Sequence, residues 1–408
     1  MRVSLKIYHC FFWLTVFCVA VPGFAPLKAM AIFSVWLYIV IKGRMRISST
    51  IWFLAVCAMI TVWSGISILK GFELNQVLDH GSRILLFFLV LAIGAFAAQK
   101  SALSRDQLDS LLLVITTGAM LLKILILIGV LTGFFTLETA EKTIGFETVT
   151  DSIGLGLLRL QFPSDIIILF LLPCYLGGRR RWKDILFLIG ISGVVLLSFS
   201  RFLFAAYLIC IFLRAFWIKR SDFVSRTGIV VTTILVLIFS ASLLTRFAGE
   251  GSSASDETRT EQIAQMDRVI LSNPFFGTGI GSHVPNYKRS DSFPFFYEVQ
   301  WYAMTMQMGA IGISLFVALL GLIIFSQIDG RRNMFYSSCI FMLWFIAGFT
   351  NPYITSLGSG FGFAILLINC RLHTNSPVVR QRHSGHRFRS LLRLPFNTEA
   401  AHEFGLIS

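Results

Sequence analysis

Long apolar runs, separated by shorter polar segments, repeat along the whole chain. Each run approaches the roughly twenty residues that an α-helix needs to cross the hydrocarbon core of a bilayer. The runs are continuous and do not alternate, which argues against a transmembrane β-barrel. The pattern therefore predicts an all-α, polytopic integral membrane protein with about twelve transmembrane helices. We place these helices at approximately 7–24, 27–42, 50–69, 82–99, 108–133, 164–178, 184–200, 202–218, 228–245, 297–325, 334–350 and 358–370.

Basic residues lie in alternate polar segments between these runs, at 42–46, 100–105, 179–181, 219–220 and 331–332. Because positively charged loops stay on the cytoplasmic side, we expect these segments to be cytoplasmic. An even number of helices then places both termini there as well. The two long segments 134–163 and 246–296 lie together on the outer side. We expect a single transmembrane domain over 1–370 and a flexible, basic cytoplasmic tail over 371–408 that contacts anionic lipid.

The composition supports the membrane assignment and narrows the chemistry. Hydrophobic residues make up 55% of the chain and charged residues only 14%, against about 25% charged in soluble domains. Cytoplasmic loops and the tail account for the net charge of +14, and the basic residues are too scattered to indicate nucleic-acid binding. The seven cysteines lie in or beside apolar runs, without metal-ligand spacing or a disulfide framework. The histidines are unclustered, and the glycines within 277–281 follow no predicted strand, so we expect neither a metal nor a nucleotide cofactor.

A short helix is expected inside the second outer segment, at about 257–272. Apolar side chains recur on one of its faces, which suits packing against the membrane-embedded helices. These side chains are Ile263, Met266, Val269 and Ile270. Pro274 ends the helix, and the glycines that follow permit tight turns and close backbone contacts.

Four arginines lie near the outer ends of the predicted helices. Arg201 occupies the turn between two apolar runs, and Arg159 precedes another run. Arg259 and Arg268 belong to the short helix. Taken singly, each is compatible with a solvated or snorkelling side chain. Guanidinium groups pair with phosphate oxygens and keep their charge, so several on one face are able to form a site for pyrophosphate or another anionic substrate.

Glu298 begins the predicted helix at 297–325. An acid in the first turn is favoured by the helix dipole, which is one interpretation. The other is a general base at the membrane surface. Trp301 and Tyr302, one turn further on, suit either the membrane interface or stacking against a sugar, and we include both as candidate substrate contacts. Lys123 lies within an apolar run, where it either has a function or snorkels to the surface.

In this order, these features resemble the O-antigen ligase/polymerase superfamily of membrane glycosyltransferases. The resemblance covers roughly residues 150–325 and rests on Ser200-Arg201, Arg259, Asn273-Pro274-Phe275-Phe276-Gly277-Thr278-Gly279 and Gly309-Ala310-Ile311-Gly312. Ligases of this superfamily typically place His-Asn eleven residues before the first glycine of the last element. Here that position is Glu298, followed by Val299. The chain therefore resembles a Wzy-type polymerase more closely than a ligase.

The resemblance implies polymerisation of oligosaccharide repeat units into O-antigen or a related surface polysaccharide, at the periplasmic face of the bacterial inner membrane. Both the glycan donor and the acceptor are carried on undecaprenyl pyrophosphate, and no metal is needed. In this interpretation Arg201, Arg259 and Arg159 bind pyrophosphate, Glu298 takes the acceptor proton, and Arg268 contacts anionic substrate. A polysaccharide chain-length regulator is a further implied partner.

Two alternatives remain open. A ligase that transfers finished glycan to lipid A core or to a protein shares the fold and differs in its acceptor. A lipid-linked oligosaccharide flippase belongs to another class, and it should carry charged groups along a cavity at the membrane midplane and often shows repeated halves. The charges here concentrate in the outer segments, and we find no internal repeat.

Overall fold

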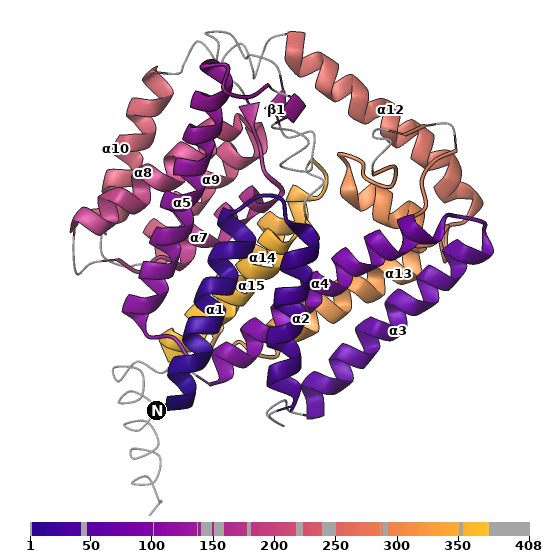
Figure 1. The fold of residues 1–408 in the computed structure, drawn as a ribbon, viewed down its shortest axis with the longest axis horizontal. Coiled ribbons are helices and arrows are strands. Elements are labelled where there is room, and N and C mark those ends of the chain that lie inside the picture. The colour runs from indigo at the N-terminus through magenta and orange to yellow at the C-terminus, as the bar shows by residue number, and fades with distance from the viewer. Residues whose placement is uncertain are drawn as a thin grey trace, which may run out of the picture.

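The computed structural model describes residues 2–41, 47–100, 102–136, 138–139, 149–150, 159–177, 181–217, 223–238, 250–285, 287–288, 293–350 and 354–374. Helices dominate the described residues (Figure 1). They are α1 (Arg2–Ala20), α2 (Ala25–Ile41), α3 (Ile47–Leu69), α4 (Leu74–Gln99), α5 (Arg105–Leu131), the 3-10 helix η1 (Pro163–Ile167), α7 (Ile168–Cys174), α8 (Arg181–Ser198), α9 (Arg201–Trp217), α10 (Phe223–Ile238), α12 (Glu250–Ser272), α13 (Gln300–Phe325), α14 (Arg331–Ala347) and α15 (Leu357–Thr374). Two strands, β1 (Val149–Thr150) and β2 (Arg159–Leu160), pair antiparallel.

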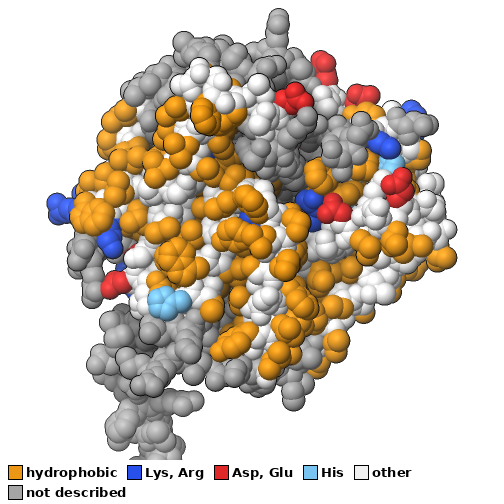
Figure 2. Space-filling view, viewed as in Figure 1, with side chains coloured by type: hydrophobic (Ala, Val, Ile, Leu, Met, Phe, Trp, Pro, Cys, Tyr) orange, Lys and Arg blue, Asp and Glu red, His pale blue; other side chains and the backbone are white. Residues whose placement is uncertain are grey.

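A helix lies at each of the twelve places where an apolar run predicts one. Within the described residues, four helical segments are long and apolar enough to cross a membrane: Ile51–Leu69, Leu74–Gln99, Arg105–Leu131 and Gln300–Phe325. The other apolar helices are shorter, so the number of transmembrane helices stays a prediction. Hydrophobic side chains cover much of the face in Figure 2, with few charged side chains among them. Such a surface suits lipid, not water.

The helices form two groups around a central pair. In Figure 1, α5, α7, α8, α9 and α10 lie on one side, and α3, α4 and α13 on the other, with α14 and α15 between them. Contact between α4 and α15 is close because Gly94 faces Ala364: a Cβ at Gly94 would lie only 2.1 Å from the Cβ of Ala364. Small residues permit such close approach of helices in membranes.

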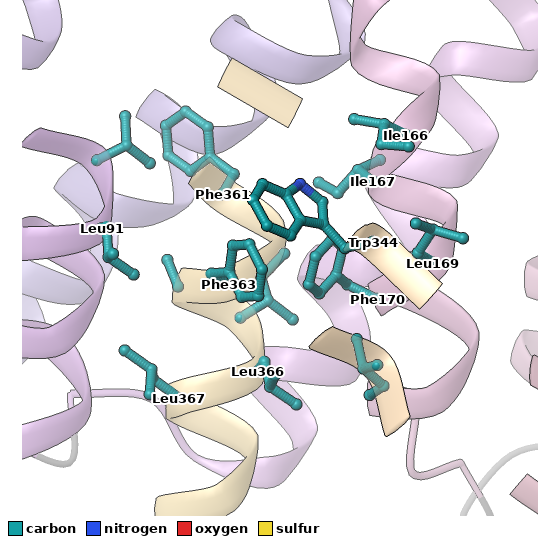
Figure 3. Close-up of a cluster of buried hydrophobic side chains, with 14 of the residues drawn as sticks. Leu91, Ile166, Ile167, Leu169, Phe170, Trp344, Phe361, Phe363, Leu366 and Leu367 are labelled. Carbon is teal, nitrogen blue, oxygen red and sulfur yellow. The ribbon is translucent and has the colours of Figure 1, made fainter. Parts of the chain in front are cut away.

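Aromatic side chains fill the centre of the bundle. Trp344 is fully buried, and Phe363 packs edge-on against it with ring centroids 5.2 Å apart. Figure 3 shows this indole among aliphatic and aromatic side chains from several helices. Its Nε1–H donates to Ile354 O (3.0 Å) and Ser359 Oγ (3.1 Å). The polar edge of the ring is therefore satisfied inside an apolar core.

The sixth predicted helix, at 164–178, is shorter than the pattern indicates. α7 ends at Cys174, one residue after an internal proline. The extended backbone that follows is held by two charged side chains. Asp109 accepts from the N–H groups of Leu176 (2.8 Å) and Gly177 (3.0 Å), and Arg214 donates to the carbonyl of Tyr175. The side chains of Asp109 and Arg214 thus replace the helical hydrogen bonds that this backbone lacks.

Lys123 is buried in the protein, so the snorkelling interpretation is wrong. Its side chain is 0% exposed and lies 2.7 Å from the carboxylate of Asp165, which is itself only 3% exposed. The ammonium also donates to Leu160 O and lies 4.4 Å from the centroid of the Phe162 ring. An ion pair shielded from solvent is satisfied only while both partners are present. The pair therefore ties α5 to β2 and η1.

Other boundaries differ from the predicted ones by a turn or two. α4 begins at Leu74, eight residues before the expected 82, because its first turns are polar and include the ion pair between Asp79 and Arg83 (3.1 Å). α15 continues to Thr374, so the first residues of the predicted tail are helical, and Arg371 pairs with Asp329 (3.0 Å). The rest of the tail and most of the outer segment 134–163 lie outside the described residues.

Candidate active site

Arg201 is positioned by a tight turn between α8 and α9. Phe199, in that turn, has a positive φ of 43°, a backbone conformation that side chains other than glycine rarely adopt. Ser200 then caps α9, since its Oγ accepts from the N–H of Leu203 (3.4 Å). Arg201 is consequently the first residue of α9, and its guanidinium projects beside a helix end.

The predicted apolar face of the outer helix is confirmed. α12 is longer than expected and starts at Glu250, but its described apolar side chains pack as predicted. Met266 is 0% exposed and contacts a cluster that includes Tyr297 and Met306. Ile263, Val269 and Ile270 pack against the same cluster. This docking places the second half of α12 beside the start of α13.

The glycine-rich segment after α12 is inserted into a break in α13. The helix is interrupted at Gly309, with φ 65° and ψ −178°, so the backbone groups around it lose their helical partners. The segment supplies new partners through four hydrogen bonds: Thr278 N–H to Met306 O (2.9 Å), Gly279 N–H to Gln307 O (2.7 Å), Ala310 N–H to Pro274 O (2.9 Å) and Ile311 N–H to Phe275 O (3.1 Å). The segments 274–279 and 306–311 are therefore joined by backbone hydrogen bonds, and we call this pair of segments the lock.

The lock requires glycine on both sides. A Cβ on Gly277 would lie 2.5 Å from backbone atoms of Gln307, and one on Gly309 would lie 2.3 Å from Phe275 O. Trp63 of α3 completes the contact, because its Nε1–H donates to Phe276 O (2.9 Å) and to Met308 O (2.8 Å).

Arg201, Arg259 and Glu298 meet through a chain of ion pairs. Arg201 contacts Asp256 (Nη2–Oδ1 2.7 Å), and Asp256 contacts Arg259 (Oδ1–Nη1 2.9 Å). Arg259 in turn contacts Glu298 (Nε–Oε2 2.9 Å). The side chains of Arg201, Arg259 and Glu298 are 23%, 22% and 19% exposed, so all three are partly buried and still reach solvent. We call these four residues the arginine–carboxylate chain.

Gln262 orients the acid of this chain. Its side chain is fully buried, and its Oε1 accepts from the backbone N–H of Glu298 (2.9 Å). The Nε2 group of Gln262 is buried without a hydrogen-bond partner in the part of the chain that the structure describes.

The carboxylates of Asp256 and Glu298 thus form ion pairs with the two arginines. The hydrogen bond from Arg201, together with the charges of Arg201 and Arg259, holds the pKa of Asp256 below its ordinary value despite the opposing effect of burial.

Tyr297 lies one residue before Glu298. Burial raises the pKa of the Tyr297 hydroxyl to about 12, so this phenol stays protonated and donates to Tyr287 O (3.3 Å).

Three further residues predicted for the site do not belong to the arginine–carboxylate chain, and for Trp301 the predicted environment was wrong. Arg268 is exposed, nine residues beyond Arg259 on α12, which is about 13 Å along the helix axis. Trp301 is 3% exposed, packs against Phe345 with ring centroids 4.8 Å apart and donates to Phe345 O (2.5 Å). The expectation that its ring stacks on a sugar does not fit this position, because the core already covers the ring. Tyr302 is half-buried against the α12 cluster.

Arg159 lies in β2, where its backbone pairs with Thr150; its side chain is outside the described part of the structure. Among the described residues, no group of three or more His, Cys, Asp or Glu side chains is placed to hold a metal. Asp256 and Gln262 were not predicted from the sequence. The i, i+3 spacing of Asp256 and Arg259 is typical of an ion pair on a helix. Glu257 and Glu261 lie even closer to Arg259 in the sequence, so the spacing did not identify Asp256 as the partner.

Residues 185–317 match the model of a family described as O-Antigen ligase. The match runs from α8 to α13 and includes Arg201, Asp256, Arg259 and Glu298. No curated protein and no solved structure matches the chain.

Proposed function

We propose that this chain, whose residues 185–317 match the model of a family described as O-Antigen ligase, is a polysaccharide polymerase of the bacterial inner membrane. It joins oligosaccharide repeat units carried on undecaprenyl pyrophosphate, at the periplasmic face of a bundle of about twelve transmembrane helices with both termini in the cytoplasm. The superfamily and the apolar helices support glycan transfer at a membrane. The assignment as a polymerase rests on the chemistry of the arginine–carboxylate chain.

The observation that carries the proposal is the meeting of Arg201 of α9, Arg259 of α12 and Glu298, which lies just before α13. Guanidinium groups at this junction provide fixed positive charge for a pyrophosphate leaving group. Glu298 lies within 2.9 Å of one of them, so an acid able to accept a proton sits beside the anion site. A transferase with a lipid-pyrophosphate donor needs these two capacities next to each other.

In the proposed reaction an acceptor sugar hydroxyl attacks the anomeric carbon of the donor glycan. A new glycosidic C–O bond forms, and the bond from the anomeric carbon to the pyrophosphate oxygen breaks. Arg201 and Arg259 stabilise the negative charge that develops on the leaving polyprenyl pyrophosphate. Glu298 takes the proton of the attacking hydroxyl. Arg159 supports the pyrophosphate, and Arg268 contacts anionic substrate further along α12.

The main alternative is a ligase that transfers glycan to lipid A core or to protein, which the description of the matching family favours. The position where such ligases typically carry histidine is occupied here by Glu298. A carboxylate is also able to serve as base, and the absence of histidine at this position favours a polymerase. A chain-length regulator is a proposed partner of the polymerase only.

The test is glycan analysis of a strain in which the gene is deleted and then replaced. Surface polysaccharide is resolved by electrophoresis in strains carrying empty vector, wild type, Glu298→Gln or Arg201→Lys, with the membrane level of each protein measured. Collapse of the ladder to a single repeat without the gene, restored by wild type and not by Glu298→Gln, is the expected result. Arg201→Lys should shorten the ladder, because ammonium cannot replace the two-pronged guanidinium contact.

Other outcomes contradict the proposal in recognisable ways. Long chains that accumulate on polyprenyl lipid, with no glycan on the core, identify a ligase. Repeat units trapped on the cytoplasmic side identify a flippase. Full activity of Glu298→Gln at normal protein level removes Glu298 from the role of base.

A further inference from the structure

Asp256 occupies the space between the two guanidinium groups. Its Oδ1 lies 2.7 Å from Nη2 of Arg201 and 2.9 Å from Nη1 of Arg259, and its Oδ2 lies 3.4 Å from Nη1 of Arg201. One carboxylate oxygen therefore bridges both arginines, while the second completes a fork with Arg201. A phosphate oxygen binds guanidinium groups in the same manner.

The carboxylate is more accessible than the arginines it joins. The side chain of Asp256 is 56% exposed, against 23% for Arg201 and 22% for Arg259. Asp256 therefore lies on the solvent side of the pair, where a soluble or lipid-borne anion must approach. Exposed ion pairs are weak, about 0.2–1 kcal/mol each, so an anion with more charge is able to replace it.

Charge balance also indicates replacement and not simultaneous binding. The two arginines carry two positive charges, and Asp256 with Glu298 already carries two negative charges. A pyrophosphate added beside these four residues would face two carboxylates at close range, which costs free energy. Removal of the Asp256 carboxylate from the bridge leaves the Nη atoms that it contacts on both arginines to the incoming phosphate oxygens.

We infer that Asp256 is an internal counter-ion that holds the two arginines in place when the site is empty and is displaced by the pyrophosphate of the substrate. The inference rests on the proposed function, since it takes Arg201 and Arg259 as the pyrophosphate site. It makes Asp256 a residue that sets affinity: its carboxylate competes with the lipid pyrophosphate for binding and returns to the arginines when the product leaves.

The experiment measures binding of farnesyl pyrophosphate to the purified full-length protein in nanodiscs by titration calorimetry. Asp256→Asn and Asp256→Ala both remove the competing charge and should lower Kd about five- to tenfold. Glu257→Gln is the matched control, because it removes the same charge from the neighbouring exposed position, and it should change Kd less than about twofold. Arg201→Lys should weaken binding. Melting temperatures show that each variant is folded.

The outcomes separate this inference from the proposed function. Unchanged or weaker binding by both folded Asp256 variants, with wild type binding and Arg201→Lys weakened, overturns the counter-ion role and leaves the pyrophosphate site intact. An equal gain from Glu257→Gln also overturns it, because the effect would then be general electrostatics. If neither wild type nor Asp256→Asn binds, the pyrophosphate site and the inference fail together. A structural role alone would not produce tighter binding.

Discussion

The substitution Gly309→Ala tests the lock between the glycine-rich segment and α13. Gly309 has φ 65° and ψ −178°, a region that is open in practice only to glycine. A Cβ there would lie 2.3 Å from Phe275 O and 2.5 Å from Phe276 N, both of which belong to the backbone. Neither contact can be relieved by rotating a side chain, so the segment must move away from the helix.

The cost follows from the contacts that this movement breaks. Placing alanine in the disallowed backbone region costs about 1–3 kcal/mol. The hydrogen bonds from Ala310 N–H to Pro274 O and from Ile311 N–H to Phe275 O would be lost, at about 0.5–1.5 kcal/mol each. The sum is a destabilisation of about 2–6 kcal/mol. Because the same segment joins α12 to α13, we also expect the contact between Arg259 and Glu298 to loosen and activity to fall.

The assay is thermal unfolding of the protein in nanodiscs, read beside polysaccharide ladders in the complemented deletion strain. Gly321→Ala is the matched control within the same helix, since the nearest atom to its added Cβ would be Phe325 Cδ2 at 3.9 Å. Alanine is favoured over glycine inside a helix, so this control should melt at the same temperature or slightly higher. Equal melting temperatures and equal ladders for the two variants would refute the lock.

Three further predictions concern buried and paired groups. Lys123→Met leaves Asp165 buried without its partner and should cost about 3–5 kcal/mol, whereas the double variant Lys123→Met/Asp165→Leu should recover much of the melting temperature; no recovery would mean that the pair is not coupled. Because the pKa of Asp256 is lowered, its ion pairs persist above the ordinary carboxyl value of 3.8 and are lost only as pH falls through the lower folded value. Wild type and Asp256→Asn should therefore show parallel pH dependence of farnesyl pyrophosphate binding between about pH 5 and 8, and converging curves in that window would contradict this assignment. Tyr297→Phe removes the acceptor of the buried Val284 N–H (2.8 Å), which should cost about 1–3 kcal/mol and lower the melting temperature; an unchanged value would show that the amide finds another partner.

Much of the helical architecture could be predicted because it depends on local pattern. Each apolar run contains the information for its own helix, and the spacing of Ile263 and Met266 was enough to predict the docking face of α12. Helical periodicity acts over a few turns and needs no distant partner. For the same reason, the positions of Arg201 at a helix end and of Arg259 on a polar helix could be read directly from the sequence. Glu298 was expected in the first turn of the next helix, but α13 begins two residues later, at Gln300.

Other features could not be predicted because they depend on which distant residues become neighbours. Trp301 has the composition of an interfacial residue, yet Phe345 and the surrounding core cover it. Lys123 lies in an apolar run, and only the packing of η1 against α5 brings Asp165 to it. The shortened α7 likewise depends on Arg214 and Asp109 from other helices.

The sequence by itself determined the class of protein, the places of the helices and three of the four members of the arginine–carboxylate chain. Only the tertiary structure decided that Arg201, Arg259 and Glu298 form one chain, and that Asp256 bridges the two arginines. The physical reason is range. Hydrophobic periodicity is a property of neighbouring residues, whereas the pairing of charges depends on distances of a few ångströms between elements that only packing brings together.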